Sequence, residues 1–279
     1  MAYLLVLILV VFGGLPMNDT LAQLAPGYYS SKNLQKLTQI DILEQFRDKQ
    51  VLILGEEHDD EEGHREKANL YQSLFKELKP SLSLEMFETD QQIILDEFSS
   101  GILEGKQISR ETRVWNQFER DYLPLLEIAK ANKVRILGAN APRRYTRIAS
   151  RGGLPALEKL NSEAKSFLPP LYMIKAFTQP EYEAKFNATM GGHSGGTNSF
   201  FLAQELWDTC MAHTIATHVA NTGNQVVHVN GRFHSDEGMG VAYRLRKLGF
   251  RVLTISMFPY RKEPVESLQK VGDILYISK

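Results

Sequence analysis

The chain has 279 residues, of which 43% are hydrophobic and 23% charged, so it is long enough to bury a substantial core. Its 32 basic and 33 acidic residues give a formal net charge of -1, which provides no long-range field to attract nucleic acid. The one cysteine, Cys210, excludes an internal disulfide framework and any zinc site built from several cysteines. These bounds indicate an ordinary globular protein without a nucleic-acid partner.

The N-terminal segment 1–22 predicts an export signal. Residues 1–14 are almost wholly apolar, and the triplet Thr-Leu-Ala at 20–22 suits signal peptidase. The apolar run is shorter than the ~20 residues that a membrane-spanning helix needs. No Lys or Arg precedes the run, so membrane association through an uncleaved N-terminus stays an alternative. We expect a secreted or periplasmic protein whose mature chain begins near Gln23.

Short β-rich runs alternate with amphipathic segments through the rest of the chain, and this pattern favours an α/β fold with a mostly parallel sheet flanked by helices. Apolar spacing of three and four predicts crossover helices over 68–78, 122–131 and 203–219. Two long connections, at about 87–121 and 146–199, predict a smaller helical lid inserted into a single α/β domain of residues 23–279. The predicted strands are Val51–Leu54, Leu82–Leu84, Val134–Leu137, Val226–Val229, Arg251–Ile255 and Ile274–Ile277.

Polar side chains follow four of these strands at their carboxyl ends. The first strand leads into GEEHDDEEGH, the second into LEMF, the third into NAPR and the fourth into NGRFH. Ligands of open α/β sheets bind outside the carboxyl ends of the strands, so these four clusters are expected to meet in one pocket. Its candidate residues are Glu56, His58, His64, Glu85, Arg143 and His234.

Other polar residues have a structural interpretation. His228 lies within a strand and is expected to be a core histidine, and Cys210 is expected to be a small buried hydrophobe in a helix. His213 and His218 are five residues apart on one predicted helix, so they do not share a face as a metal-binding pair would. An exposed helix start, where acidic side chains favour the helix dipole, is expected for Glu61, Glu62, Arg65, Glu66 and Lys67.

The order of the motifs resembles the ChaN haem-binding family, which is similar in turn to the erythromycin esterase and Tiki proteins. The motifs are GE-x-H with a second His, LEMF, NAPR, the QELWD segment at 204–208, and Gly231 to His234, and they run from about Val51 to Leu245. Residue by residue, the resemblance implies pocket roles for Glu56, His58, His64, Glu85, Arg143, His193, Gln204, Asp208 and His234.

The resemblance implies an extracytoplasmic protein of iron or haem uptake that binds haem as its cofactor. A Tyr, His or Met from the lid would ligate the iron, and Arg143 or a neighbouring cation would pair with a propionate. Haem held at a dimer face would make the protein a homodimer. The sequence does not choose among the candidate iron ligands, which are Tyr172, Met173, Tyr182, Met190 and His193.

The same residues leave a second function open, hydrolysis of an ester, amide or phosphate. His58, Glu85 and His234 could hold a divalent metal such as zinc, with Glu56 or Glu85 accepting the proton of an attacking water. Without a metal, His58 or His234 could act as the general base, and Arg143 would hold an anionic substrate group. No Gly-x-Ser-x-Gly elbow or reactive-cysteine motif is visible in the sequence, so acyl-enzyme chemistry is disfavoured. Whether the chain is an enzyme stays open at this point.

Overall fold

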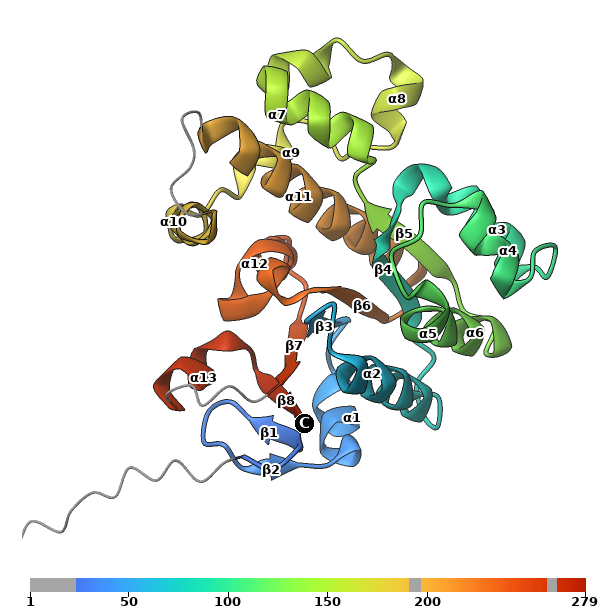
Figure 1. Cartoon of the computed structure of the whole chain (residues 1–279), viewed down its shortest axis with the longest axis vertical. Coiled ribbons are helices and arrows are strands. Elements are labelled where there is room, and N and C mark those ends of the chain that lie inside the picture. Colours follow the sequence, from blue (N-terminus) through green and yellow to red (C-terminus); the bar gives the residue numbers. More distant parts are fainter. Residues whose placement is uncertain (1–23, 191–196, 260–264) are drawn as a thin grey trace, which may run out of the picture.

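An eight-stranded sheet lies at the centre of the described part of the chain, which comprises residues 24–190, 197–259 and 265–279 of a computed structural model (Figure 1). The strand order is β2-β1-β8-β7-β3-β6-β4-β5. The strands from β8 to β5 run parallel, whereas β1 is antiparallel to β8 and to β2. The predicted α/β class with a mostly parallel sheet is therefore confirmed. The strands are β1 Gly27–Ser30, β2 Lys36–Leu37, β3 Val51–Glu56, β4 Ser81–Glu88, β5 Ile136–Asn140, β6 Val226–Gly231, β7 Val252–Pro259 and β8 Ile274–Ser278.

The six strands expected from the sequence correspond to β3 through β8. All six extend further at the carboxyl end than their apolar runs predict; in β3, β6 and β7 the parallel pairing continues through Glu56. The pairing of β4 with β5 changes register between Leu84 and Glu88. The edge strands β1 and β2 have four and two residues, which is too short to show a period in the sequence.

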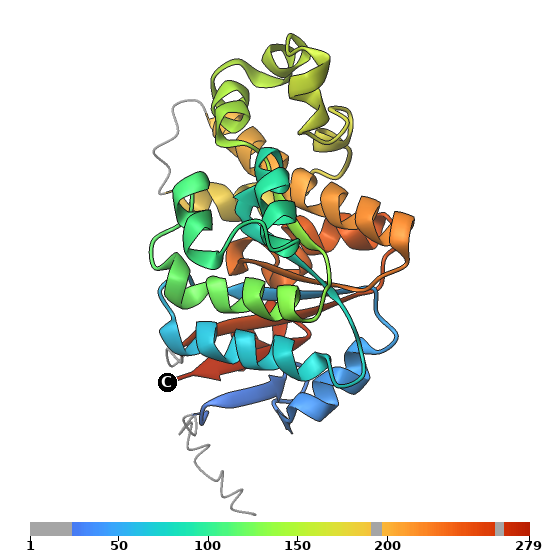
Figure 2. The ribbon, with the colours of Figure 1, turned by 90° about the vertical axis from the view of Figure 1, so that its right-hand side faces the viewer.

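Helices cover both faces of the sheet (Figures 1 and 2). On one face, α2 (Glu61–Leu74) contacts β3, β7 and β8, and α6 (Leu123–Ala131) contacts β4. On the other face, α11 (Thr197–Thr222) contacts β5 and β6, and α12 (Gly240–Lys247) contacts β7. The result is a three-layer arrangement with a separate apolar core on each side of the sheet.

The alternation of side chains along β3 shows how one strand serves both cores. Leu52 and Leu54 pack into the core that holds α2 and α6, whereas Val51 and Ile53 pack into the core that holds α11 and α12. All four side chains are fully buried, since successive residues of a strand point to opposite faces of the sheet. β3 is therefore apolar along both faces, and its charged residue, Glu56, lies at its carboxyl end.

The two segments predicted as a lid are largely helical. The second segment overlaps helix α7 (Arg143–Glu158), which follows β5 and bends at Gly153, where φ has a left-handed value of +67°. The other helices and 3-10 turns are α1 Gln39–Phe46, η1 Thr89–Gln91, α3 Gln92–Ser99, α4 Gly105–Glu111, α5 Phe118–Asp121, α8 Ser162–Ser166, α9 Met173–Ala176, α10 Pro180–Thr189, η2 Arg232–His234, η3 Asp236–Gly238 and α13 Val265–Val271.

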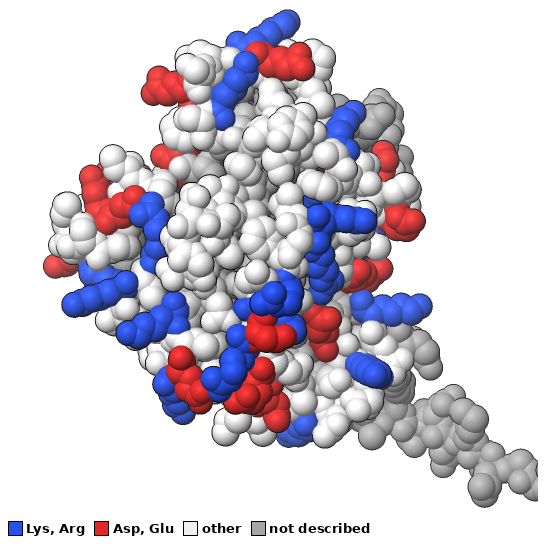
Figure 3. Space-filling view, turned by 180° about the vertical axis from the view of Figure 1, so that it is seen from behind, with Lys and Arg blue, Asp and Glu red and all other residues white. Residues whose placement is uncertain are grey.

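The surface charge and the composition of the helices can be compared with the expectations from the sequence. On the face opposite to that of Figure 1, Lys and Arg side chains lie beside Asp and Glu side chains around a broad area of other residues (Figure 3). This mixing of signs fits the formal net charge of -1.

None of the helices in the described ranges combines the length and apolar composition that crossing a membrane requires. The predicted export signal at 1–22 lies outside the described residues.

Candidate functional site

A cleft lies outside the carboxyl ends of β3, β4, β5 and β6, where ligands of open α/β sheets bind. It consists of two adjoining cavities that share Trp115, Arg143 and His234. The first, the aromatic cavity, has a volume of about 680 Å³ and is lined among others by Glu85, Glu88, Trp115, Arg143, Arg147, Phe186, Met190, Phe200, Gln204, Trp207 and His234. The second, the histidine cavity, has a volume of about 810 Å³ and is lined among others by Glu56, Glu57, His58, Trp115, Tyr122, Arg143, Gly231, Phe233 and His234.

His58 stands on the wall of the histidine cavity, two residues beyond β3. Its side chain is 47% exposed, and its Nδ1 donates to the buried Glu56 Oε1 at 3.0 Å. The ring of Trp115 packs edge-on against it, with the ring centroids 4.7 Å apart. Burial lowers the pKa of His58, and the Glu85 carboxylate opposes that shift. Glu56 therefore orients the imidazole, whose Nε2 lies next to Gly231.

A buried polar cluster surrounds the Glu56 carboxylate. The Tyr122 hydroxyl donates to Glu56 Oε1 at 2.5 Å, and Lys67 Nζ forms an ion pair with Glu56 Oε2. Lys67 also donates to His64 Nδ1 at 2.8 Å, while His64 Nε2 donates to the His58 carbonyl at 3.1 Å. We call this group, formed by Glu56, His58, His64, Lys67 and Tyr122, the His58 corner.

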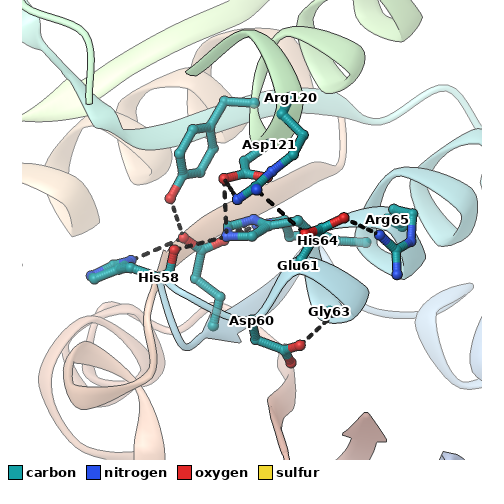
Figure 4. Close-up of polar contacts among 11 residues, drawn as sticks. His58, Asp60, Glu61, Gly63, His64, Arg65, Arg120 and Asp121 are labelled. Atoms are coloured by element: carbon teal, nitrogen blue, oxygen red, sulfur yellow. Dashed lines mark hydrogen bonds and ion pairs between the residues drawn. The ribbon is translucent and has the colours of Figure 1, made fainter. Parts of the chain in front are cut away.

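Figure 4 shows His64 lying between His58 and the Arg120–Asp121 pair. Arg120 Nε donates to Asp121 Oδ1 at 2.6 Å, and Asp121 Oδ2 lies 3.9 Å from His64 Nε2. Nearby, Asp60 accepts from Gly63 N at 3.0 Å and caps α2, which carries both His64 and Lys67. The cap therefore fixes the start of α2 next to the carboxyl end of β3.

The predicted exposure of Lys67 is wrong. Lys67 has no exposed surface, and burial lowers its pKa with Asp121 opposing that shift. The buried positions of α2 recur with helical spacing, so Lys67 lies on the inner face of the helix while Arg65 lies on the outer one. A buried lysine needs a partner, and Glu56 provides it. The buried residues of α2 are Gly63, His64, Lys67, Leu70, Tyr71 and Leu74.

His234 lies in η2 directly after β6, at the junction of the two cavities. Its Nδ1 donates to Asp208 Oδ1 at 2.5 Å, and its Nε2 lies 3.5 Å from Glu85 Oε1. Burial alone would lower the pKa of His234, but the Glu85 and Asp208 carboxylates outweigh it and raise that pKa to about 9. The side chain is therefore an imidazolium at neutral pH. Glu85 is held in turn by Gly231 N, which donates to Oε2 at 2.7 Å.

Behind His234, a second buried network extends into α11 and α12. Gln204 Nε2 donates to the Tyr182 hydroxyl at 2.7 Å and lies 3.0 Å from His234 Nδ1. The Arg244 guanidinium lies 3.7 Å from Asp208 Oδ2 and is itself almost fully buried. We call this group, formed by Tyr182, Gln204, Asp208, His234 and Arg244, the His234 corner.

The other predicted cation, Arg143, begins α7 beyond the NAPR motif. Its Nε donates to Glu88 Oε1 at 2.6 Å, and Glu88 also accepts from Arg113 at 2.6 Å. One turn further along α7, the exposed Arg147 lines the aromatic cavity and has no hydrogen-bond or ion-pair partner among the described side chains. Arg143 is therefore partly neutralised by a carboxylate, whereas Arg147 keeps its charge available to a ligand.

The residues predicted as iron ligands in the lid take different places. Met190 is 51% exposed and lines the aromatic cavity. Tyr182 is fully buried in the His234 corner, and burial raises its pKa well above the usual value, so it offers no oxygen to the cleft. Tyr172 is 78% exposed and lines neither cavity. His193 lies outside the described residues.

The predicted pocket residues divide into cleft walls and supports. Glu56, His58, Glu85, Arg143, Gln204 and His234 line the cleft. His64 and Asp208 do not line it, because both are buried beneath residues that do. The expected core positions of His228 and Cys210 are confirmed, since both are buried, and His228 Nδ1 lies 3.0 Å from Ser83 Oγ.

The zinc alternative has no support in the geometry. Within the described ranges no group of three or more His, Cys, Asp or Glu side chains is arranged to hold a metal ion, so the predicted set His58, Glu85 and His234 forms no metal site. The reason is visible in His234, because both of its nitrogens face carboxylate oxygens and a metal ligand needs a free imidazole lone pair.

Three important side chains were missed by the sequence analysis. Trp115 lines both cavities but comes from an irregular segment without a local signal. Tyr122 was read as a residue of a crossover helix, and its hydroxyl contact with Glu56 depends on tertiary packing. Arg244 lies on α12 and reaches its carboxylates only across the core. Pairing between distant segments has no counterpart in local sequence periodicity.

Comparison with known proteins gives both a family and a set of similar folds. A family model described as "Haem-binding uptake, Tiki superfamily, ChaN" matches residues 42–245. No curated protein matches the chain. A structure described as cofacial haem binding to ChaN of Campylobacter jejuni is similar over 90% of this chain and 96% of that one, with a TM-score of 0.69 and 17% identity.

A second structure, the type III effector HopBA1, is similar over 92% of this chain and 98% of that chain, with a TM-score of 0.52 and 9% identity. At these identities the two structures establish the shared fold alone. The family model covers well over half of the chain and includes every strand-end motif of the cleft. The chain therefore belongs to the ChaN family of the Tiki superfamily.

Proposed function

We propose that this protein binds haem in the strand-end cleft. The observation that carries the proposal is the aromatic cavity, whose volume of about 680 Å³ is in the usual range for small-molecule and cofactor sites. Aromatic side chains and a methionine on its walls suit a porphyrin face, which is large, planar and apolar. These side chains are Trp115, Phe186, Met190, Phe200 and Trp207.

The rim of the aromatic cavity suits the polar edge of haem. Arg147 offers a guanidinium without a described partner, and Arg143 adds a second one that Glu88 partly neutralises. Guanidinium groups bind carboxylates in bidentate fashion, so a propionate at this rim would find a matching partner. When bound, haem supplies an iron centre, and this chain supplies apolar walls, a cationic rim and imidazole or thioether ligands.

The proposal includes a location and an assembly. An export signal at 1–22 would place the mature chain outside the cytoplasm, where a protein of iron or haem uptake would meet its ligand. Two exposed apolar side chains at the mouth of the aromatic cavity, Met190 and Phe200, support self-association on haem binding. N-terminal sequencing of the exported protein and light scattering with and without haem test these two points.

A titration of the full chain with haemin, followed at the Soret band, tests haem binding. We expect a saturable shift with a defined stoichiometry. Phe200→Glu places a charge on the apolar wall, so we expect the affinity to fall at least tenfold. The matched control is Ile93→Glu on α3, because Ile93 is 67% exposed and lines neither cavity. A linear, unsaturable response, or equal effects of the two variants, would contradict the proposal.

A second candidate function, metal-free hydrolysis, is favoured by one observation. His58 has a lowered pKa and faces a cavity that also contains the His234 imidazolium. A neutral imidazole can take the proton of a water that attacks an ester or amide, and a nearby cation can stabilise the oxyanion that forms. Ester hydrolysis by the haem-free protein, lost in His58→Ala and kept in His213→Ala, would support it, and its absence over a panel of esters would argue against it.

A further inference from the structure

The helix α10 contributes two side chains to the aromatic cavity but buries little of its own surface. Phe186 lines the cavity from the second half of the helix, and Met190 lines it from the C-terminal end. All ten residues of α10 are described, and Tyr182 is the only one of them that is buried. By contrast, α7 buries four residues, among them Tyr145 and Leu157. A helix with so few buried contacts depends on each of them to keep its place.

Tyr182 attaches α10 to the protein interior through its hydroxyl. Gln204 Nε2 donates to this hydroxyl at 2.7 Å, and the same nitrogen lies 3.0 Å from His234 Nδ1. Burial raises the pKa of Tyr182 well above its usual value, and the Asp208 carboxylate adds to that shift, so the phenol stays neutral. Because a buried hydroxyl or amide without a partner is costly, the bond to Gln204 favours the docked position of the helix.

A second attachment joins α10 to the segment that follows β6. Lys185 Nζ forms an ion pair with Glu237 Oε1 of η3 at 2.8 Å, and it lies 5.4 Å from the centroid of the Phe233 ring. The rings of Tyr182 and Phe186 pack against Phe233, with centroid distances of 5.4 and 6.4 Å. The helix is therefore attached at Tyr182 to the His234 corner and at Lys185 to η3.

The position of α10 affects the walls of the aromatic cavity directly. Phe186 lies one turn after Tyr182 on the same helix, so the attachment at Tyr182 also sets where the Phe186 ring stands. Phe186 and Met190 both move with α10, so undocking of the helix would remove two of the five apolar side chains that suit a porphyrin face. A planar apolar ligand would then lose much of the contact that holds it.

We propose that Tyr182 and Lys185 are positioning residues that keep α10 on the aromatic cavity and thereby limit the rate at which haem leaves it. This inference rests on the proposed haem function and adds the control of release to it. The undocked helix would be a minor state in equilibrium with the docked one, and haem would leave through that state. Tyr182, which the sequence suggested as an iron ligand, acts instead from behind the cavity wall.

The test measures haem release from the loaded full chain to an excess of apomyoglobin, followed by stopped-flow absorbance. Tyr182→Phe keeps the ring and removes the hydroxyl, so we expect release to become about fivefold faster, as the loss of one hydrogen bond predicts. The matched control is Tyr71→Phe. Tyr71 is also fully buried, and its hydroxyl donates to the Pro80 carbonyl at 3.0 Å in the core that holds α2 and α6. We expect this control to release haem at the wild-type rate.

A surface variant tests the second attachment and does not depend on the folding of Tyr182→Phe. Glu237→Gln removes the charge that faces Lys185, so we expect release to become about twofold faster, because a partly exposed ion pair contributes little. The control is Asp96→Asn, which breaks a pair with Arg135 that is similarly exposed and lines neither cavity. Equal release rates in the two variants would exclude Lys185 as a positioning residue.

The absorbance spectrum separates a positioning residue from an iron ligand. If Tyr182 only holds α10, the Soret and charge-transfer bands of Tyr182→Phe stay as in the wild type. Loss of a phenolate ligand would change these bands and overturn the proposal. Equal release from the wild type and Tyr182→Phe, or an equal rise in Tyr182→Phe and Tyr71→Phe, would also overturn it and would leave haem binding in place.

Hydrogen exchange of the haem-free protein tests the attachment without the ligand. We expect the amides of residues 180–189 to exchange faster in Tyr182→Phe than in the wild type and to be unchanged in Tyr71→Phe. Unchanged exchange in a folded Tyr182→Phe protein would show that the hydroxyl does not hold the helix. Absence of saturable haem binding by the wild type would overturn the proposed function and the role in release together, whereas faster exchange would still assign Tyr182 to the attachment of α10.

Discussion

The two corners of the cleft show that contact with a carboxylate does not by itself fix what a histidine can do. In the His58 corner, the Glu56 carboxylate is shared among His58, the Tyr122 hydroxyl and Lys67. In the His234 corner, two carboxylates converge on one imidazole. The first histidine has a lowered pKa and a free nitrogen, and the second has a raised pKa and none. The balance of charge around the ring decides the difference.

The comparison suggests a division of labour within one cleft. In the His234 corner, the imidazolium of His234 lies between Glu85 of β4 and Asp208 of α11 and holds the two carboxylates together. The His58 corner presents a half-exposed imidazole to the histidine cavity and buries the groups that orient it. The four predictions that follow begin with the largest expected effect. The first three each alter one part of this comparison, and the last alters the rim of the cleft.

The interior cation of the His58 corner can be removed by Lys67→Ala. The Glu56 carboxylate would then remain buried without its ion-pair partner, and breaking a buried pair in this way costs about 3–5 kcal/mol of unfolding free energy. Urea unfolding measures the loss. The control, Lys76→Ala, changes an exposed lysine just beyond α2 and should leave stability within about 0.5 kcal/mol of the wild type. Equal stability of Lys67→Ala and the wild type would show that Lys67 does not hold the corner.

The His234 corner predicts a loss of stability at alkaline pH. The pKa of His234 is raised from 6.5 to about 9 in the folded protein, so its contribution is complete below pH 6.5 and is lost as pH rises through 9. A shift of this size corresponds to about 3 kcal/mol. Unfolding by urea at pH 6.5, 7.5 and 9 measures this slope. The groups that face the ring are Glu85, Asp208, Gln204 and Arg244.

Two variants show whether that slope belongs to His234. In His234→Gln no imidazole titrates at this position, so stability should change much less between pH 6.5 and 9. In His213→Gln the slope should stay as in the wild type, because burial lowers the pKa of His213 and moves its titration below this range. A wild-type slope in both variants would assign the alkaline loss to another group.

The point where the corners meet can be altered by Gly231→Ala. The backbone at Gly231 has an ordinary φ of -60°, so alanine adopts it without strain, but the new Cβ would lie 2.8 Å from His58 Nε2. The His58 ring must therefore shift, and we expect haem affinity to fall about tenfold while the unfolding free energy falls by about 1–3 kcal/mol. Soret titrations measure the affinity.

A double-variant cycle shows whether Gly231→Ala acts through the imidazole. If it does, adding the substitution to His58→Ala should have little further effect on haem affinity, since the group that it displaces is already gone. Additive losses in the double variant would mean that Gly231 contributes to binding independently of His58.

The sequence predicted the walls of the cleft better than its supports. Glu56, His58, Glu85 and His234 were placed at one edge of the sheet because parallel strands end there, and all four line the cleft. Lys67 was misplaced because its charge was read by itself, although its spacing from His64 and Tyr71 put it on the buried face of α2. The helical spacing of Lys67 indicated that it is buried, but its charge led to the prediction that it is exposed.

Other parts of the site had no signal in the sequence. Tyr122 reaches Glu56 across 66 residues, and Arg244 meets Asp208 from another helix, so each contact exists only after the layers have packed. The protonation states of the two histidines depend on the same packing. Residue types at strand ends predicted that the cleft would contain imidazoles, and the groups behind them determined what those imidazoles can do.

The smallest expected effect concerns the rim, which belongs to neither corner. Arg147 lies at the mouth of the aromatic cavity without a described partner, so Arg147→Ala should weaken haem binding severalfold, by less than about 1 kcal/mol, because an exposed ion pair with a propionate is well solvated. The loss should shrink at high salt. Arg151→Ala is the matched control, since Arg151 lies one turn further along α7 and does not line the aromatic cavity. Equal losses in the two variants would indicate general attraction by the basic face of α7, whereas a loss confined to Arg147→Ala would mean that the ligand's carboxylates lie at this rim.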